Sequence, residues 1–333
     1  GLARRTMVLR TKLTEALGIE APIIQGGMQH VGFAEMASAV SNAGALGILT
    51  ALTQPTPEDL RKEIRKCRTM TDKPFGVNLA ILPMLIPADY DAYMNVICEE
   101  KVAAVEITGG SPRKYMKQLR EAGVVVIHKS ATIKHALKAQ SDGVDFIEIA
   151  GFESAIAGRS SEDDVTTWVL VTKALQTLTT PVIVSGSATG IQLAGALAMG
   201  AVGLTMGTRF MATKEAPIQD SIKQFIADPK NNELSTTLAL RTLQNGTRVA
   251  KNDVSREILR LEAEGVKDKG ELLRLASGKR TKAMLQENGD AQSAMWSCGQ
   301  SIGLINDIPT CKELVQRLVS EAETRLQAGA RIV

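Results

Sequence analysis

Short runs of apolar, often β-branched residues recur along the chain as far as Met206. Eight can be counted: Pro22–Gln25, Leu46–Thr50, Phe75–Leu79, Ala103–Ile107, Val124–His128, Phe146–Ile149, Val182–Val184 and Gly203–Met206. Runs that are apolar throughout, without polar alternation, are typical of parallel strands buried on both faces. Segments long enough for crossover helices separate most of them, so we expect a (β/α)8 TIM barrel. An open doubly wound sheet stays as an alternative, because the count alone does not establish closure.

The intervening segments carry helical spacing and helix-end signals. Phe33–Ala43 places apolar residues on one face, and Pro57–Arg68 begins with acidic and ends with basic residues, which suits the helix dipole. The same pattern predicts helices over Ser111–Ala122, Thr132–Ser141 and Ile191–Met199.

The pattern changes after Thr213. Charge-rich segments with helical spacing follow, and no strand-like run stands out among them: Pro217–Ala227, Glu233–Arg248, Ser255–Gly265 and Lys269–Gly278. We therefore predict a small helical domain over residues 215–303, inserted in a barrel formed by residues 1–214 and 304–333. The last barrel helix is expected at Thr310–Gln327, where Thr310 and Glu313 form a capping box.

Composition narrows the function. Hydrophobic residues make up 44% and charged residues 23% of the 333-residue chain, as in ordinary globular proteins. Aromatic residues at 3% and a net charge of +3 argue against nucleic-acid partners. No apolar run reaches the roughly 20 residues that span a bilayer, so no membrane partner is expected. The four cysteines are isolated in the sequence, which predicts no metal site and a cytoplasmic location.

In a barrel of this kind, function belongs at the carboxyl ends of the strands. The first predicted strand ends in Gln25-Gly26-Gly27-Met28, a turn poor in side chains that would let a flat ligand lie against the backbone. Asn78 and Lys129 end the third and fifth strands, and Ala150-Gly151 followed by Glu153 ends the sixth. The competing interpretation of Lys129 is a salt-bridged residue on the rim of the barrel. The competing interpretation of Asn78 is an amide that only forms a turn.

The last two strands both end in glycine turns. Ser185-Gly186-Ser187 and Met206-Gly207-Thr208 place small residues where backbone N–H groups can approach an anion closely. The region after strands 7 and 8 is the usual phosphate site of this fold. Together with the cation and amides, these turns suit a phosphorylated, flat cofactor such as FMN. The competing interpretation is two ordinary turns that need glycine only for their geometry.

Several runs in the same order resemble the nitronate monooxygenase family, formerly called 2-nitropropane dioxygenase, whose close branch includes FMN-dependent NADH:quinone reductases. They are PIIQGGMQHVG, KPFGVNLAILP, VVVIHKS, GVDFIEIAGFES, PVIVSGSATG, GALAMGAVGLTMGTRFMATKEAPI and MWSCGQSIGLI. The resemblance implies an FMN-dependent oxidoreductase that oxidises alkyl nitronates with O2. NADH:quinone reductase, with NADH or NADPH as donor, and FMN-dependent enoyl reductase stay as alternatives. A small-molecule nitronate or quinone and O2 are the expected partners, with a homodimer as the expected assembly.

The resemblance also assigns roles by position. The flavin ring would lie beside Gln25–Met28 and its polar edge beside Asn78 and Lys129, with Ala150 and Gly151 nearby. The two glycine turns would hold the phosphate, and Trp296–Gly303 would cover the ring, with Gln300 in contact. The expected catalytic residues are Met28, Lys129 and Glu153, with Pro83 on a gate loop.

One departure affects the chemistry. Family members usually carry a Gly-His pair after the strand-6 glutamate, but the stretch from Glu153 to Arg159 contains no histidine. A base that removes a proton from a neutral nitroalkane is therefore missing, whereas an anionic nitronate needs none. A flavin-binding protein without turnover stays as an alternative. So does a phosphosugar-type barrel enzyme that would use carboxylates such as Glu106, Glu148 and Glu153.

Overall fold

The structure is a computed structural model that describes residues 9–81, 88–156, 164–265 and 269–332. Eight parallel strands form one sheet, in the order β1-β8-β7-β6-β5-β4-β3-β2. The strands are β1 (Ile23–Gln25), β2 (Gly47–Thr50), β3 (Phe75–Ile81), β4 (Ala104–Gly109), β5 (Val125–Ser130), β6 (Phe146–Ala150), β7 (Val182–Ser185) and β8 (Gly203–Met206). All eight predicted strands are confirmed; their ends differ from the prediction by at most two residues, and those of β8 match it.

The two edge strands of this sheet meet and close it into a barrel. Ile24 and Leu46 form a parallel bridge, and the Gln25 amide donates to the Leu46 carbonyl at 2.9 Å. The Gln25 side chain completes the seam, because its Oε1 accepts from the Ile48 amide at 3.0 Å. The prediction of a TIM barrel is thus confirmed over an open sheet.

The interior of the barrel changes character along the strands. Its lower part is one apolar cluster, which includes Ile48, Ile127, Phe146 and Ile183, and Leu13 and Leu17 of α1 (Lys12–Leu17) pack into it. Side chains two residues further along a strand point to the same face. At that level, nearer the carboxyl ends of the strands, the side chains inside the barrel are polar: Asn78, Glu106, Lys129, Glu148, Ser185 and Thr205. The polar layer therefore lies at the carboxyl ends, above a closed apolar floor.

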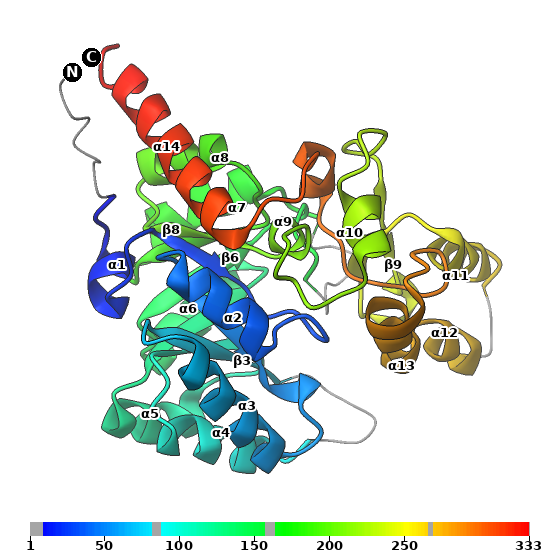
Figure 1. The fold of residues 1–333 in the computed structure, drawn as a ribbon, viewed down its shortest axis with the longest axis horizontal. Helices are drawn as coiled ribbons and strands as arrows, with labels where there is room; N and C mark the ends of the chain where they lie inside the picture. The colour runs from blue at the N-terminus through cyan, green and yellow to red at the C-terminus, as the bar shows by residue number, and fades with distance from the viewer. Residues whose placement is uncertain (1–8, 82–87, 157–163, 266–268, 333) are drawn as a thin grey trace.

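Helices surround the barrel (Figure 1). They are α2 (Ala34–Asn42), α3 (Pro57–Met70), α4 (Tyr90–Glu99), α5 (Met116–Ala122), α6 (Ile133–Asp142), α7 (Thr167–Thr177), α8 (Gly190–Met199) and α14 (Cys311–Gly329), with short turns η1 (Ala51–Thr53) and η2 (Arg113–Tyr115) between them. The predicted capping box of α14 is confirmed, since Thr310 Oγ1 accepts from the Glu313 amide at 3.2 Å.

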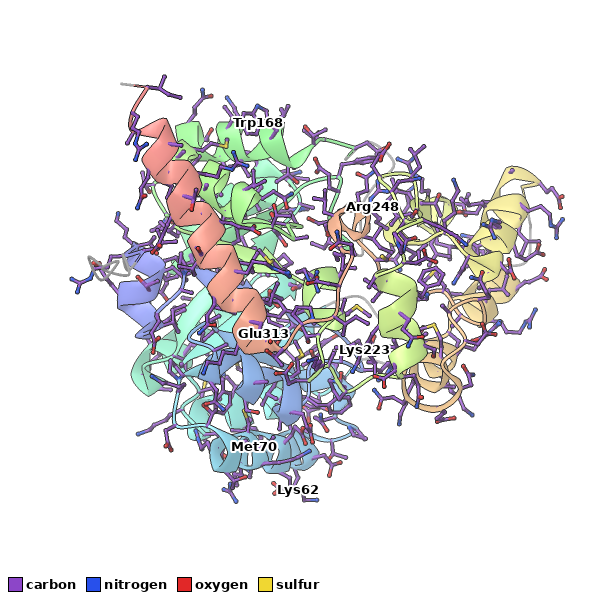
Figure 2. The ribbon with its side chains drawn as sticks, turned by 45° about the horizontal axis from the view of Figure 1, so that its top comes forward. Lys62, Met70, Trp168, Lys223, Arg248 and Glu313 are labelled. Carbon is purple, nitrogen blue, oxygen red and sulfur yellow. The ribbon has the colours of Figure 1, made fainter. Side chains whose placement is uncertain are left out.

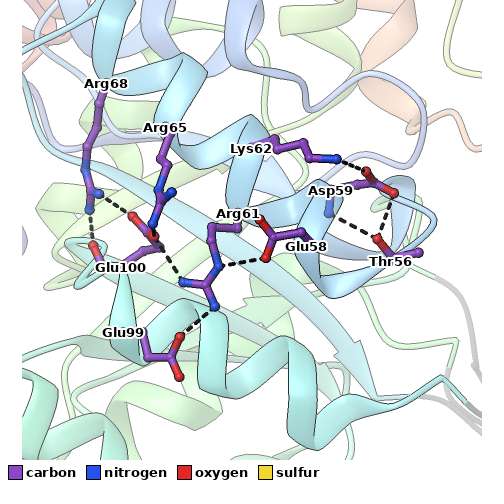
Figure 3. Close-up of polar contacts among 9 residues, drawn as sticks. All are labelled: Thr56, Glu58, Asp59, Arg61, Lys62, Arg65, Arg68, Glu99 and Glu100. Carbon is purple, nitrogen blue, oxygen red and sulfur yellow. Dashed lines mark hydrogen bonds and ion pairs between the residues drawn. The ribbon is translucent and has the colours of Figure 1, made fainter.

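Neighbouring helices α3 and α4 are joined by ion pairs around one carboxylate. Glu100, at the end of α4, lies within 3.1 Å of the guanidinium groups of Arg61, Arg65 and Arg68, all on α3 (Figure 3). The three arginines lie on one face of α3 because they are four and three residues apart. The Glu100 side chain is only 7% exposed, so this network fastens α3 to the neighbouring βα unit.

Residues 215–303, which we call the insertion, lie to one side of the barrel (Figure 1). After α9 (Thr208–Met211), they form α10 (Asp220–Ile226), β9 (Thr236–Ala239), η3 (Arg241–Leu243), β10 (Thr247–Ala250), α11 (Asp253–Ala263), α12 (Lys269–Leu275), α13 (Gly278–Ala283) and the π-helical turn η4 (Met284–Asn288). The turn η5 (Gln300–Leu304) leads back to the barrel. Leu240, Val249, Ile258 and Leu272 belong to an apolar cluster within the insertion.

The prediction of a helix over Glu233–Arg248 is wrong. The segment forms most of an antiparallel hairpin, in which β9 pairs with β10 and Thr247 lies opposite Ala239. Two threonines in β9 and a threonine and a valine in β10 favour strands, and the chain reverses through η3 between two residues with positive φ, Leu240 and Gln244. Leucine spacing indicated a helix here, but the β-branched residues and the turn determine the local structure.

Within the described residues, no helix combines the length and the apolar character needed to cross a membrane. The four cysteines are free thiols, three of them buried. Burial raises the pKa of the Cys298 thiol to about 12, so this sulfur stays protonated at neutral pH.

Candidate active site

A buried ionic cluster lies in the polar layer of the barrel. The Lys129 ammonium on β5 lies 2.8 Å from Glu106 Oε1 on β4 and 3.0 Å from Glu148 Oε1 on β6. Both carboxylates are fully buried, and the lysine side chain is 13% exposed. Lys129 is therefore an interior residue that joins three adjacent strands, and the interpretation of a rim salt bridge does not hold.

The first glycine turn lies directly on this cluster. The Gly27 amide donates to Glu106 Oε2 at 3.0 Å, and Asn78 Nδ2 donates to the same oxygen at 2.6 Å. A Cβ on Gly27 would come within 2.3 Å of the Asn78 side chain, and one on Gly26 within 2.7 Å of Thr205 Cγ2. Only glycine fits at these two positions, so the turn presents bare backbone above the charges.

The two carboxylates have different proton affinities. Burial alone would raise the pKa of Glu106, but Lys129 and the Gly27 amide outweigh it and hold that pKa below its ordinary value. At Glu148 burial dominates, the neighbouring Glu106 adds to it, and Lys129 opposes both, so that the pKa rises to about 7. The pKa of Lys129 is raised, because both carboxylates outweigh the effect of burial. The lysine is thus charged, and Glu148 titrates near neutrality.

The two predicted anion turns end neighbouring strands. β7 pairs with β8, with Ser185 opposite Thr205, so Gly186 and Gly207 lie at the same end of the barrel. Gly186 has a φ of +100°, and a Cβ there would lie 2.3 Å from Ser154 Oγ. The helix α8 begins at Gly190, with a capping box from Thr189, and its N-terminus follows the first turn. Helix N-termini and bare glycine turns favour a bound anion.

Met28 connects the first turn to the last. Its sulfur would lie 3.6 Å from a Cβ on Gly207, and its backbone exchanges hydrogen bonds with the Thr50 hydroxyl at 2.9 and 3.0 Å. The structure therefore brings together the predicted residues Gly26, Gly27 and Met28 with Asn78, Lys129 and the turn at Gly207.

A segment of the insertion contacts the residues that follow β6 and β8. The Gly299 amide donates to Thr208 Oγ1 at 3.0 Å, and the Gln300 amide donates to the Glu153 carbonyl at 2.9 Å. The Gln300 side chain bonds to the Glu233 carbonyl at 3.3 Å, inside the insertion. Trp296 is buried, and its ring packs edge-on against Phe225 at 5.8 Å, so it belongs to the core of the structure.

Arg248 makes a second link between the insertion and the barrel. Its Nε donates to the Phe152 carbonyl at 2.7 Å, and the guanidinium stacks on the Phe152 ring at 4.2 Å. Figure 2 shows Arg248 where the insertion faces the barrel. The loop after β6 is thus held by a buried cation from β10, in addition to the contacts of Gly299 and Gln300.

Other predicted site residues have structural partners. Glu153 Oε2 accepts from the Thr167 amide at 2.8 Å and from its hydroxyl at 2.6 Å, so this carboxylate caps the start of α7. Gln25 belongs to the β1–β2 seam described above. Ala150 is buried at the end of β6, and Gly151 follows it where a Cβ would meet the Thr167 backbone at 2.2 Å. Catalytic roles for Glu153 and Met28 stay predictions, and Pro83 lies outside the described residues.

None of the three histidines of the chain belongs to the sequence between β6 and α7. His128 is a residue of β5, and its ring contacts Ser130 Oγ at 3.0 Å and the Gly110 carbonyl at 3.3 Å. His135 is exposed on α6. His30 follows the first turn with a φ of +62°, and burial, followed by the charge of Lys282, lowers its pKa. His30 therefore lies between the insertion and Thr53, whose hydroxyl accepts from its amide at 3.0 Å.

The cofactor site predicted from the sequence does not include Glu106, Glu148 and Thr205. A signal was available, because each acidic residue interrupts an otherwise apolar strand, as in Ile147-Glu148-Ile149. Buried carboxylates are rarely left without a partner, and Lys129 lies on the strand between them. Thr205 Oγ1 is buried and has no hydrogen-bond partner within the part of the chain that the structure describes.

Two hollows of about 460 and 450 Å³ lie elsewhere on the molecule. The first is lined by residues 9–12, by Ala201 and Val202 before β8, and by Leu197 and Leu326, and the second lies between α8 and α14. Both are remote from the carboxyl ends of the strands, and neither contains a residue of the ionic cluster.

Comparison with known families gives one clear result. The profile of the family described as nitronate monooxygenase matches residues 10–93 and 83–321, which is most of the chain. A nitronate monooxygenase from Pseudomonas aeruginosa is 28% identical, over 93% of this chain and 98% of that protein.

Other relatives carry different names. A (3aS,4S,5R,7aS)-5-hydroxy-7a-methyl-1-oxo-octahydro-1H-indene-4-carboxyl-CoA dehydrogenase from Rhodococcus jostii is 32% identical, over 96% of this chain and 98% of that protein. Among solved structures, FabK from Thermotoga maritima matches with a TM-score of 0.86 and 34% identity, over 97% of this chain and 99% of that one. A nitroalkane oxidase from Streptomyces ansochromogenes matches with a TM-score of 0.81 and 26% identity, over 95% and 99%.

Proposed function

Since this chain belongs to the nitronate monooxygenase family and is an oxidoreductase, we propose that it binds FMN noncovalently and oxidises alkyl nitronates with O2. The observation that carries the proposal is the arrangement of the glycine turns. The turns at Gly26–Gly27, Gly186 and Gly207 end β1, β7 and β8, which are consecutive in the barrel. They surround a mouth in which Lys129 supplies the cation.

The residues present fit FMN. A Cβ on Gly26, Gly27 or Gly186 would collide with its surroundings, so these turns form a cradle that only bare backbone can make. Thr205 faces Gly26 with its Cγ2 methyl, and its buried hydroxyl, which has no partner among the described residues, would gain one from a polar ring edge. Ser185–Ser187 and Gly207–Thr208 would hold the phosphate, while Asn78 and Lys129 would face the ring. Bound FMN would supply the electron acceptor for the substrate.

The choice of a nitronate follows from the bases at the mouth. Glu153 is hydrogen-bonded to Thr167, and Glu106 is held ionised by Lys129, Asn78 and Gly27. Glu148 is fully buried beside the Lys129 ammonium. Within the described residues, no histidine accompanies the loop after β6. A substrate that arrives deprotonated needs no strong base, which favours an anionic nitronate over a neutral nitroalkane.

A second candidate is the oxidation or reduction of an acyl thioester, which includes the predicted enoyl reductase. It is favoured by the 32% identity to a carboxyl-CoA dehydrogenase and by the similarity to FabK, both over nearly the whole chain. NADH:quinone reductase activity stays as the third alternative. The homodimer, the cytoplasmic location and the role of residues 215–303 as a separate domain over the site stay predictions.

The first experiment tests the cofactor with a matched pair of variants. Gly186 and Gly200 have φ values of +100° and +105°, so alanine strains the backbone similarly at both. A Cβ at Gly200 meets only Leu175, at 4.0 Å, whereas at Gly186 it meets Ser154. We expect Gly186→Ala to weaken FMN binding at least tenfold in a fluorescence titration, and Gly200→Ala to bind like the wild type. A wild-type protein that binds no FMN would refute the proposal.

The second experiment identifies the substrate. The FMN-loaded protein is mixed anaerobically with propionate 3-nitronate, a 2-enoyl-CoA, NADH or NADPH, and the flavin absorbance is followed. Rapid bleaching by the nitronate alone, with recovery of the absorbance on admission of O2, is the expected result. Bleaching by NADH followed by reoxidation with the enoyl-CoA or with a quinone would replace the proposal by one of the alternatives.

A further inference from the structure

Two carboxylates share one ammonium at the centre of the barrel mouth. Glu106, Lys129 and Glu148 come from β4, β5 and β6, and the two oxygen–nitrogen distances are 2.8 and 3.0 Å. If both carboxylates are ionised, the cluster carries one uncompensated negative charge in a fully buried place. Such a charge is costly, and the group with the fewest hydrogen bonds to its ionised form is the one that takes a proton.

The hydrogen bonds identify Glu148 as that group. Glu106 accepts bonds from the Gly27 amide and from Asn78, in addition to its ion pair with Lys129. Glu148 is faced by Lys129 from β5, by Glu106 from β4, and by the Ser185 hydroxyl from β7. Only Lys129 among these charged groups favours its ionised form, because Glu106 has the same sign. The rise of the Glu148 pKa to about 7 is consistent with this asymmetry.

The cluster lies immediately beneath the turn that would carry the ligand. A Cβ on Gly26 would be 3.4 Å from the Lys129 ammonium and 3.5 Å from Glu106 Oε1, and no side chain is present to separate them from the mouth. A negative charge that forms on this turn would therefore act on the whole cluster. It would disfavour the ionised form of Glu148 further.

We propose that Glu148 takes up one proton when negative charge forms on the ligand above Gly26 and Gly27. This inference rests on the proposed FMN site. Reduction of bound FMN by the proposed nitronate donor would add two electrons and one proton to the flavin ring and would leave the ring anionic. A second proton passes from solvent to a Glu148 oxygen, forming an O–H bond and leaving Lys129 paired with Glu106 alone. Lys129 can then compensate the new anion, and Glu148 acts as a positioning residue for that charge.

The reduction potential of bound FMN tests the proposal between pH 7.5 and 9, where Glu148 is largely ionised before reduction. Each additional proton taken up with two electrons steepens the fall of the potential by about 30 mV per pH unit. We expect this extra slope in the wild type and in Glu313→Gln, a control at the exposed start of α14, and its loss in Glu148→Gln. Equal slopes in all three proteins would overturn the inference while leaving the FMN site intact. Absence of bound FMN would overturn both proposals.

A direct proton count covers the case in which Glu148→Gln does not fold. The loaded wild-type protein is reduced at a cathode in a divided cell at pH 8, in weakly buffered solution with an indicator dye, so that no chemical donor releases protons and the uptake per flavin is read from the dye. About two protons per flavin are expected from the linkage, one for the ring and one for Glu148. A count of about one would contradict the role of Glu148.

Discussion

Replacement of Glu148 by glutamine should change how the stability of the flavin-free protein depends on pH. The pKa of the Glu148 carboxyl is raised from 4.5 to about 7 in the folded chain, chiefly by burial. A pKa raised on folding means that the folded state holds the proton more tightly than the unfolded state. The stability that this proton contributes is complete below pH 4.5 and is lost as the pH rises through 7.

The size of the effect follows from the difference between these two values. Each unit of pKa corresponds to about 1.4 kcal/mol, so a change from 4.5 to about 7 amounts to about 3 kcal/mol. Glutamine has nearly the shape of the protonated carboxyl and does not titrate. The free energy of unfolding of Glu148→Gln relative to that of the wild type should therefore rise by about 3 kcal/mol between pH 4.5 and pH 8.

Urea unfolding at five pH values across this range, followed by tryptophan fluorescence, measures the difference. The titrations of the other groups are common to both proteins and cancel, so only the pH dependence of the difference matters. A constant offset would report the altered contact with Lys129 and nothing about titration. Two curves that run parallel from pH 4.5 to 8 would refute the assignment of a neutral Glu148 at low pH.

Three further predictions concern stability and the cover of the site. Glu100→Gln should lower the free energy of unfolding by about 1–3 kcal/mol, because a buried carboxylate bonded to three guanidinium groups is lost, and the loss should shrink in 0.5 M NaCl; a loss below 0.5 kcal/mol would contradict the network. Thr310→Ala removes the cap of α14 and should lower the free energy of unfolding by about 1 kcal/mol, whereas Thr310→Ser should restore it. Equal losses in both variants would show that the hydroxyl does not stabilise the helix. Arg248→Lys keeps the charge but loses the hydrogen bond from Nε to the Phe152 carbonyl and the planar stacking on the Phe152 ring. Limited proteolysis should therefore cleave the loop after β6 several-fold faster in this variant. Unchanged cleavage would show that this loop does not depend on Arg248.

Local signals in the sequence determined much of this fold. Apolar runs without alternation identified all eight strands, because a strand buried on both faces has no polar side to show. The capping box at Thr310 placed the last helix, since cap and helix lie within four residues of each other. The hairpin of the insertion does not follow from such signals, because the chain reverses through Leu240 and Gln244, whose positive φ values no glycine marks in the sequence.

The same distinction between local sequence signals and long-range contacts applies to the candidate site. Glycine turns and the strand-end residues Asn78 and Lys129 could be read from the chain, since each belongs to a single βα unit. The partners of Lys129 could not, because the pairing of β5 with β4 and β6 brings Glu106 and Glu148 to it from separate units, 23 and 19 residues away in sequence. Likewise, Glu153 caps α7 and Gln25 bonds across the β1–β2 seam because backbone amides there have no other partner once the strands are paired. Those unpaired amides are known only from the folded chain. The sequence determined which residues reach the barrel mouth, and only the tertiary structure decided which charges compensate one another there.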